Sequence, residues 1–346
     1  MNGKPVLYRC NTGTVISDPS REFGKKLLCD SLVFSMGDAC AFSCTYCYVK
    51  AVAWRFTKHV IDAHNDASLV NEGCPRKRDF HEVVIRRANA LEVLKAKLLK
   101  ADGTRRYANP KDRRVIFSST LVDVAANMEL LQETALACNL ILEHTGWQIR
   151  LLSKSSLLAK IVEIIPERYH RRLIFGFSTG TLDERTCRAI EPGTAKIGSR
   201  IKALHSLQDD GFRTFGMICP SLPQEDYDAF SREVCDAIRV DRCEHVWAEP
   251  INVRKQAMSR TLDGLRAEGL HREAGLLEAV HGPGTKAAWE DYARRTFLAH
   301  SANIPAAKLR FLQYLTPGTA AWWLPMRRKG AVLLVKEARE LGASGM

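Results

Sequence analysis

The sequence from Gly37 to Tyr48, GDACAFSCTYCY, carries Cys40, Cys44 and Cys47 in a C-x3-C-x2-C spacing. It directly follows the apolar run 31–36 (SLVFSM), which predicts a β-strand. Three thiolates in one tight loop can each hold a different iron on one face of an iron–sulfur cube. The fourth iron then stays open to a small molecule, which is typical of a reaction site rather than of a pure electron carrier. No fourth cysteine or Cys/His pair follows at zinc-finger spacing.

The rest of the composition is that of an ordinary globular protein. Of the 346 residues, 46% are apolar and 26% are charged. No stretch approaches the roughly 20 uncharged apolar residues of a membrane span, and charges interrupt the first thirty residues, so no signal-peptide core fits there. We therefore expect a cytoplasmic protein with no membrane partner, whose eleven cysteines stay reduced. Most of the eight cysteines outside the loop are expected to be small buried residues.

The formal charge of +12 leaves two interpretations open, a solvated basic surface or an electrostatic footprint for a polyanion such as nucleic acid. Aromatic residues between arginines and lysines near the C-terminus, including Trp322 and Trp323, fit stacking on nucleotides. They also fit a packed lid, which we favour because the tryptophan pair lies beside Pro and Gly with no repeat.

Strands and helices alternate along most of the chain. Six strands are expected, at 32–36, 114–117, 148–152, 173–177, 213–218 and 245–248. Helices are expected at 89–100, 127–142, 156–164, 182–190, 197–209 and 224–238. This alternation predicts an α/β fold with a parallel sheet and right-handed crossovers, an open (β/α)6 partial barrel of the TIM type. Its active site is expected at the C-terminal ends of the strands.

The chain is expected to have three parts. An N-terminal segment spans 1–30, and the barrel spans 31–255, with a basic insertion at about 50–112. A mainly helical C-terminal extension or lid spans 256–346, because the strand pattern stops beyond Arg254. Within it 308–314 predicts one further strand, and 331–341 predicts a closing helix.

Polar residues follow the predicted strands at their C-terminal ends. These residues are Ser119, Lys154, Ser178, Cys219 and Glu249. Apolar strands that end one after another in such residues suit a polar ligand lying across the barrel mouth. The alternative is helix capping for the serines, and for Cys219 a half-buried small residue before Pro220.

The cysteine loop resembles that of the radical S-adenosylmethionine (SAM) enzymes, in which a C-x3-C-x2-C loop follows the first barrel strand. An aromatic residue precedes the last cysteine of that loop, here Tyr46. The resemblance implies that Cys40, Cys44 and Cys47 ligate a 4Fe-4S cluster whose open iron binds the amino and carboxylate groups of SAM. An electron from a reductase, flavodoxin or ferredoxin would then cleave SAM and release a 5′-deoxyadenosyl radical.

Further segments between about 30 and 255 are similar to the spore photoproduct lyase-like branch of these enzymes. They include Lys154-Ser155, Ser178-Thr179, 190–193 and 248–252. The resemblance implies that Lys154 pairs with the methionine carboxylate and that Ser178 hydrogen bonds SAM. Ser119 is a third candidate for contact with SAM, and Tyr46 and Glu249 complete the cofactor-binding candidates.

The chain departs from this branch at one position. The lyase proper has a cysteine after the second strand as hydrogen-atom donor, where this chain has FSST at 117–120. A hydroxyl O–H bond is too strong to replace a thiol, so Cys219 is the candidate for a relocated donor. We expect a radical SAM lyase or transferase that acts on a small molecule or nucleotide. The alternatives are a nucleic-acid lesion enzyme of the photoproduct-lyase kind, transfer of the 3-amino-3-carboxypropyl group of SAM, and a non-enzymatic metal-stabilised binding protein.

Overall fold

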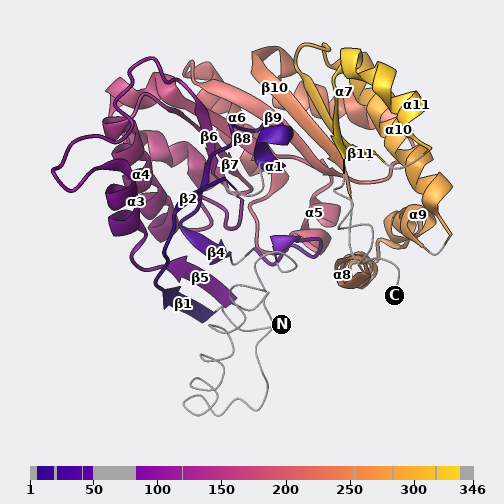
Figure 1. The fold of residues 1–346 in the computed structure, drawn as a ribbon. Coiled ribbons are helices and arrows are strands. Elements are labelled where there is room, and N and C mark those ends of the chain that lie inside the picture. Colours follow the sequence, from indigo (N-terminus) through magenta and orange to yellow (C-terminus); the bar gives the residue numbers. More distant parts are fainter. Residues whose placement is uncertain are drawn as a thin grey trace, which may run out of the picture.

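The structure is a computed structural model of the whole chain (Figure 1). It describes residues 6–18, 22–40, 42–49, 83–118, 120–251, 255–282, 284–315 and 318–335. Ser119 and most of the basic insertion predicted at 50–112 lie outside the described residues, as does the end of the predicted closing helix.

One mostly parallel sheet of nine strands forms the centre of the molecule, in the order β12-β11-β10-β9-β8-β7-β6-β3-β2. Its parallel strands are β3 (Val33–Phe34), β6 (Val115–Ser118), β7 (Gln148–Ser153), β8 (Leu173–Ser178), β9 (Arg213–Ser221), β10 (Cys243–Pro250), β11 (Leu309–Leu315) and β12 (Ala331–Val335). The short β2 (Ile16–Ser17) is antiparallel to β3 at the edge. The sheet is strongly curved but open, since no pairing between β12 and β2 occurs in the part of the chain that the structure describes. The predicted α/β class and parallel sheet are confirmed, but the predicted number of six parallel strands is wrong, because eight strands run parallel.

The two additional parallel strands come from the C-terminal part of the chain. β11 confirms the further strand predicted at 308–314. It pairs with β10, and β12 pairs with β11, so the strand pattern does not stop at Arg254. The helix predicted at 331–341 is wrong for 331–335, which form β12. Periodicity could not separate the two states there, because Ala331–Val335 (AVLLV) is a short, continuous apolar run. The C-terminal extension is therefore a mixed continuation of the sheet rather than a mainly helical unit.

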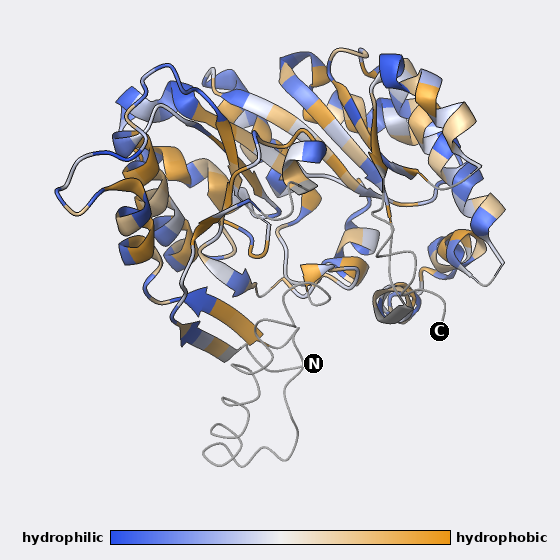
Figure 2. Cartoon of the chain, in the orientation of Figure 1, coloured by the Kyte–Doolittle hydropathy of each residue, from blue (hydrophilic) through white to orange (hydrophobic). Residues whose placement is uncertain are grey.

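Helices cover the convex side of the sheet (Figure 1). They are α3 (Ala90–Leu98), α4 (Met128–His144), α6 (Ile197–Asp209), α7 (Tyr227–Ile238), α10 (Lys286–Asn303) and α11 (Ala320–Trp323), with the short η4 (Val240–Arg242) and η5 (Leu324–Lys329). Figure 2 shows apolar residues gathered on the strands and on the helix faces turned toward them, where the largest core cluster forms. Trp323 is fully buried in that cluster, in agreement with a packing role for the tryptophan pair. Among the described residues, we find no helix with the length and apolar character of a membrane span.

One further local prediction needs correction. The segment predicted as a helix at 156–164 forms the 3-10 helix η2 (Ser156–Glu163), followed by η3 (Glu167–Arg172).

Near the mouth, α5 (Glu184–Ile190), α8 (Lys255–Ala267) and α9 (His271–His281) pack together. The break between α8 and α9 falls at Gly269, where φ is +72°, a backbone conformation that favours glycine.

A second, three-stranded sheet carries the cysteine loop. It consists of β1 (Val6–Cys10), β5 (Val83–Arg87) and β4 (Gly37–Ala39), in the order β1-β5-β4. Of the strand predicted at 32–36 only Val33–Phe34 form a strand, β3, and the loop leaves from the following β4 rather than directly from the main sheet. Gly37 permits this pairing, because a Cβ atom there would lie 2.4 Å from the carbonyl oxygen of Ile85.

Residues 22–31, the inner segment, pack on the concave face of the main sheet and begin with α1 (Glu22–Lys25). The indole nitrogen of Trp247 on β10 donates to the carbonyl oxygen of Lys26 at 2.9 Å. Asp30 exchanges backbone and side-chain hydrogen bonds with Val115 on β6. Leu28, Phe117, Phe215 and Trp247 form part of the apolar cluster beneath this segment. The inner segment therefore separates the mouth of the concave face from its opposite end.

Candidate functional site

The cysteine loop is docked at the mouth by hydrogen bonds to the segment that follows α5. The backbone N–H of Thr45 donates to Ile190 at 2.9 Å, and that of Gly193 donates to Phe42 at 3.0 Å. The hydroxyl groups of Thr45 and Thr261 on α8 lie 3.0 Å apart. The loop is thus held from two sides beside the ends of the parallel strands.

The three loop cysteines lie near enough to influence one another's ionisation. Burial raises the pKa of Cys40 to about 12, assisted by Cys47 and Asp123, while backbone groups of Asp123 and Phe42 hydrogen bond the sulfur and oppose the rise. The pKa of Cys44 is raised by burial and by Glu191, and Lys154 opposes that rise. These thiols therefore need a bound cation to become thiolates, as metal ligands do.

The arrangement was tested against the metal groups that the sequence implies. Among the described residues, no three His, Cys, Asp or Glu side chains converge as the ligands of one metal ion would. Ligands on three different irons of a cube do not share one ion, so they need not converge in that way. In number, chemistry and mutual proximity, Cys40, Cys44 and Cys47 fit such a cluster.

Glu191 is the centre of a buried polar network beside the cysteine loop. Only 4% of its side chain is exposed, and one carboxylate oxygen accepts from Arg200 at 2.7 Å. The other oxygen accepts the hydroxyl of Tyr46 and lies 3.5 Å from the ammonium of Lys154. Burial alone would raise the pKa of Glu191, but Lys154 and Arg200 outweigh burial and hold it below its ordinary value. The carboxylate is therefore ionised at neutral pH.

Lys154 links this network to the end of β8. Its ammonium donates to the hydroxyl of Ser178 at 2.6 Å and lies 5.9 Å from the centre of the Tyr46 ring. Burial alone would lower the pKa of Lys154, but Glu191 and Cys44 together raise it by more than burial lowers it. The net shift is upward. An ammonium has three N–H donors, and Ser178 and Glu191 engage two of them. No further hydrogen bond or ion pair of this ammonium occurs among the described residues, which leaves the third N–H for an anionic ligand.

Ser178 also connects Lys154 to β9. Its hydroxyl donates to the carbonyl oxygen of Cys219 at 2.6 Å, and its own carbonyl accepts from Arg200 at 2.9 Å. The thiol of Cys219 lies 3.9 Å from Glu249, and burial, with Glu249, raises its pKa to about 12. Cys219 is therefore a thiol, not a thiolate, at neutral pH.

Glu249 is positioned by the inner segment, since its carboxylate lies 3.7 Å from the ammonium of Lys26. Lys26 also lies 5.6 Å from the centre of the Tyr314 ring. Burial would lower the pKa of Lys26, but Glu249 and Tyr314 more than compensate and raise it. One side of the mouth thus carries a charged pair that comes from the N-terminal part of the chain.

The structure brings the predicted residues together in two connected groups. Tyr46, Lys154 and Ser178 surround Glu191, while Cys219 and Glu249 lie on the other side of Ser178. Ser119 lies outside the described residues. Ser155 caps η2 by accepting from Leu157, as the capping alternative predicts.

Sequence reasoning did not identify Glu191, Arg200 and Lys26 as site residues. For Glu191 a signal exists, because a carboxylate directly follows the buried end of α5 and precedes Pro192-Gly193. Arg200 lies within α6 and Lys26 lies ahead of the first strand, where the sequence offers no comparable signal.

Comparison with known proteins found no matching family model and no matching curated protein. Solved structures of spore photoproduct lyase are similar to this chain. A variant with bound AdoMet and dinucleoside spore photoproduct has a TM-score of 0.47 at 13% identity, over 80% of each chain. The lyase complexed with dinucleoside spore photoproduct has a TM-score of 0.48 at 12% identity, also over 80% of each chain. Because these TM-scores and sequence identities are low, the function of the site is inferred from its own residues.

Proposed function

We propose that the protein is a radical SAM enzyme that holds a 4Fe-4S cluster through Cys40, Cys44 and Cys47. The observation that carries this proposal is the position of the ammonium of Lys154. Its charge acts on the Cys44 thiol, and Ser178 and Glu191 leave one of its N–H donors unused. A three-cysteine loop next to an available cation suits a cofactor that binds both an iron and a carboxylate partner.

When bound, the cluster and SAM would supply a 5′-deoxyadenosyl radical by one-electron cleavage of a sulfur–carbon bond. Lys154 would pair with the methionine carboxylate, and Ser178 would hold Lys154 in place. Glu191 would keep Lys154 protonated and fix the Tyr46 ring through its hydroxyl. Lys154 and Arg200 each carry one positive charge, and Glu191 carries one negative charge. The network therefore presents one net positive charge to the ligand.

We further propose that Cys219 acts as hydrogen-atom donor at the mouth. Its thiol is kept protonated by burial and by Glu249, which is the state that a hydrogen-atom donor needs. Glu249 and Lys26 border the same thiol and would contact a polar substrate.

The proposal is tested by anaerobic reconstitution with iron and sulfide, followed by dithionite and SAM. We expect a brown protein that binds about four irons and releases 5′-deoxyadenosine. Cys44→Ala should lose the cluster and the nucleoside. The matched control Cys235→Ala, which changes a buried cysteine of α7, should retain both. A colourless wild-type protein, or an unchanged Cys44→Ala variant, would overturn the proposal.

The released nucleoside separates the alternatives in the same experiment. Methylthioadenosine in place of 5′-deoxyadenosine would indicate transfer of the 3-amino-3-carboxypropyl group. Bound zinc without sulfide would indicate a metal-stabilised binding protein.

A further inference from the structure

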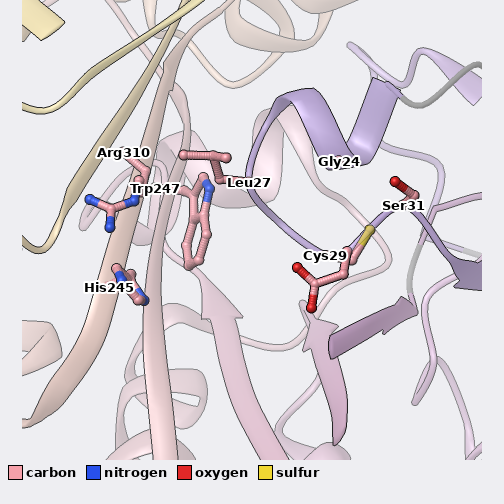
Figure 3. Close-up of a pocket in the computed structure, with 8 residues that line it drawn as sticks. Gly24, Leu27, Cys29, Ser31, His245, Trp247 and Arg310 are labelled. Carbon is pink, nitrogen blue, oxygen red and sulfur yellow. The ribbon is translucent and has the colours of Figure 1, made fainter. Parts of the chain in front are cut away.

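A cavity lies at the opposite end of the concave face from the mouth. Its volume is about 550 Å³, and it opens between the inner segment and the first halves of β10 and β11 (Figure 3). Asp30 and Ser31 line one side, and His245, Trp247 and Arg310 line the other. His245 precedes Glu249 by four residues on β10, which is about 13 Å along a strand. The cavity is therefore distinct from the proposed cofactor site.

Positive charge gathers on the β10–β11 side of this cavity. Arg310 lines it directly, and the guanidinium of Arg150 lies 4.8 Å from the Trp247 ring. Arg213 also lies on this face, but Glu244 pairs with it. Within the described ranges, no carboxylate forms an ion pair with Arg150, His245 or Arg310.

The acid that lines the cavity is already engaged. The carboxylate of Asp30 accepts from the backbone N–H of Val115 at 2.7 Å, which fixes the inner segment to β6. Asp30 keeps its negative charge, which acts on Arg150, but among the described residues it forms no ion pair with Arg150, His245 or Arg310. Arg150, Arg213 and Arg310 still outnumber the two carboxylates, Asp30 and Glu244.

One buried nitrogen atom of a residue that lines the cavity, Nδ1 of His245, has no hydrogen-bond partner among the described residues. A buried polar atom without a partner costs about 1–3 kcal/mol. In a cavity that Arg310 also lines, this favours a ligand whose polar atoms carry negative charge.

We propose that this cavity binds a small oxyanion of the sulfate or phosphate class between Arg310 and His245. Guanidinium and imidazolium groups both form charge-assisted hydrogen bonds with such oxygens. Arg150, behind Trp247, adds a positive field to the same site. The inner segment forms the other side, so the bound ion would hold that segment against β10 and β11.

Binding is coupled to the protonation of His245. Burial lowers the pKa of His245, Arg310, Arg150 and Lys308 lower it further, and Glu244 opposes them. An anion beside His245 offsets burial and the three cations, so it raises that pKa. Binding therefore strengthens as the pH falls and His245 becomes protonated.

The test uses the full-length protein with carbon-13-labelled histidine and follows the His245 ring signal by NMR. The signal is assigned by its loss in His245→Gln. Sulfate is the probe, because its charge does not change between pH 5 and 8, and chloride at equal ionic strength is the reference. We expect sulfate to move the His245 midpoint upward by about 0.5 pH unit or more. Arg310→Gln should remove most of this shift, and Arg188→Gln, an exposed arginine of α5, should keep it.

An unchanged His245 midpoint in wild type with sulfate would overturn the proposal, and this result does not depend on any variant folding. An equal sulfate shift in Arg310→Gln and wild type would overturn it as well. Parallel titration with 5′-AMP distinguishes two sources of the oxyanion. Tighter binding than sulfate supports a phosphate carried by a larger molecule, and weaker or equal binding supports the free ion.

Discussion

Lys154 is the residue whose position carries the proposed function. Replacing it with methionine keeps much of the side-chain length but removes the donor that would meet a carboxylate. Because hydrogen bonds to charged groups contribute about 1.5–3 kcal/mol, SAM should bind at least about tenfold more weakly. Equilibrium titration of the cluster-loaded protein with SAM measures this change.

The matched control for that experiment is Lys160→Met, at an exposed lysine of η2. It should leave the dissociation constant for SAM unchanged. Equal affinities of wild type and Lys154→Met for SAM would show that Lys154 does not contact the cofactor.

Glu191 is expected to stabilise the fold through Arg200, whose side chain is fully buried. Glu191→Gln leaves that guanidinium without its ion-pair partner, which costs about 3–5 kcal/mol for a buried pair. The pKa of Glu191 is lowered in the folded protein, so its stabilisation is present above the unfolded value of 4.5 and is lost as the pH falls through the folded value. Urea unfolding from pH 4.5 down to pH 3 should show a larger loss of stability in wild type than in Glu191→Gln.

Glu268→Gln serves as the comparison, because Glu268 pairs with Arg188 at the surface. An exposed pair contributes at most about 1 kcal/mol. If the two variants lost the same stability, the buried network would not have the role assigned to it.

At the scale of elements, α8 depends on a glycine that faces the cysteine loop. A Cβ atom at Gly264 would lie 2.5 Å from the carbonyl oxygen of Ala189 and 3.6 Å from Thr45. Gly264→Ala should therefore destabilise the protein by about 1–2 kcal/mol, because overpacking outweighs the gain in helix propensity. Chemical denaturation measures the effect.

Gly275 in α9 offers the opposite case. No atom lies within 4 Å of a Cβ placed there, so Gly275→Ala should stabilise the protein by about 0.5–1 kcal/mol. A stabilising Gly264→Ala would contradict the close contact between α8 and α5.

The sequence was sufficient for the central elements but not for the edges of the sheet. Strands such as Leu173–Ser178 are buried throughout, so their apolar runs predict them well. The predictions for β3 and β12 failed for different reasons. β3 has only two residues, and β12 is a short apolar run without alternation. Glu191 was missed because its role depends on Tyr46 and Lys154, which are 145 and 37 positions away in the chain.

At the scale of the whole molecule, a buried histidine should make the protein sensitive to acid. Burial lowers the pKa of His300 on α10 to about 4. The unfolded chain therefore takes up a proton near pH 6.5 while the folded chain does not, so stability falls as the pH drops from 6.5 toward 4. The loss is up to about 3 kcal/mol, at 1.36 kcal/mol for each pH unit.

Urea unfolding at pH 7, 6 and 5 checks this expectation. His300→Gln should flatten the dependence, and His271→Gln, at an exposed position, should preserve it. A pH dependence of the same size in wild type and His300→Gln would exclude His300 as its cause.

The inner segment has a consequence for how the chain assembles. Lys26 leaves the ribosome early, but its partner Trp247 follows 221 residues later. The apolar side of Leu28 has to wait until β10 and β11 exist before its burial is complete. Contacts of such sequence separation form late, because the entropy of loop closure has to be overcome first. The N-terminal part of this protein therefore locks into place only when synthesis is nearly finished, and a nascent chain arrested before Trp247 should leave residues 22–31 open to protease.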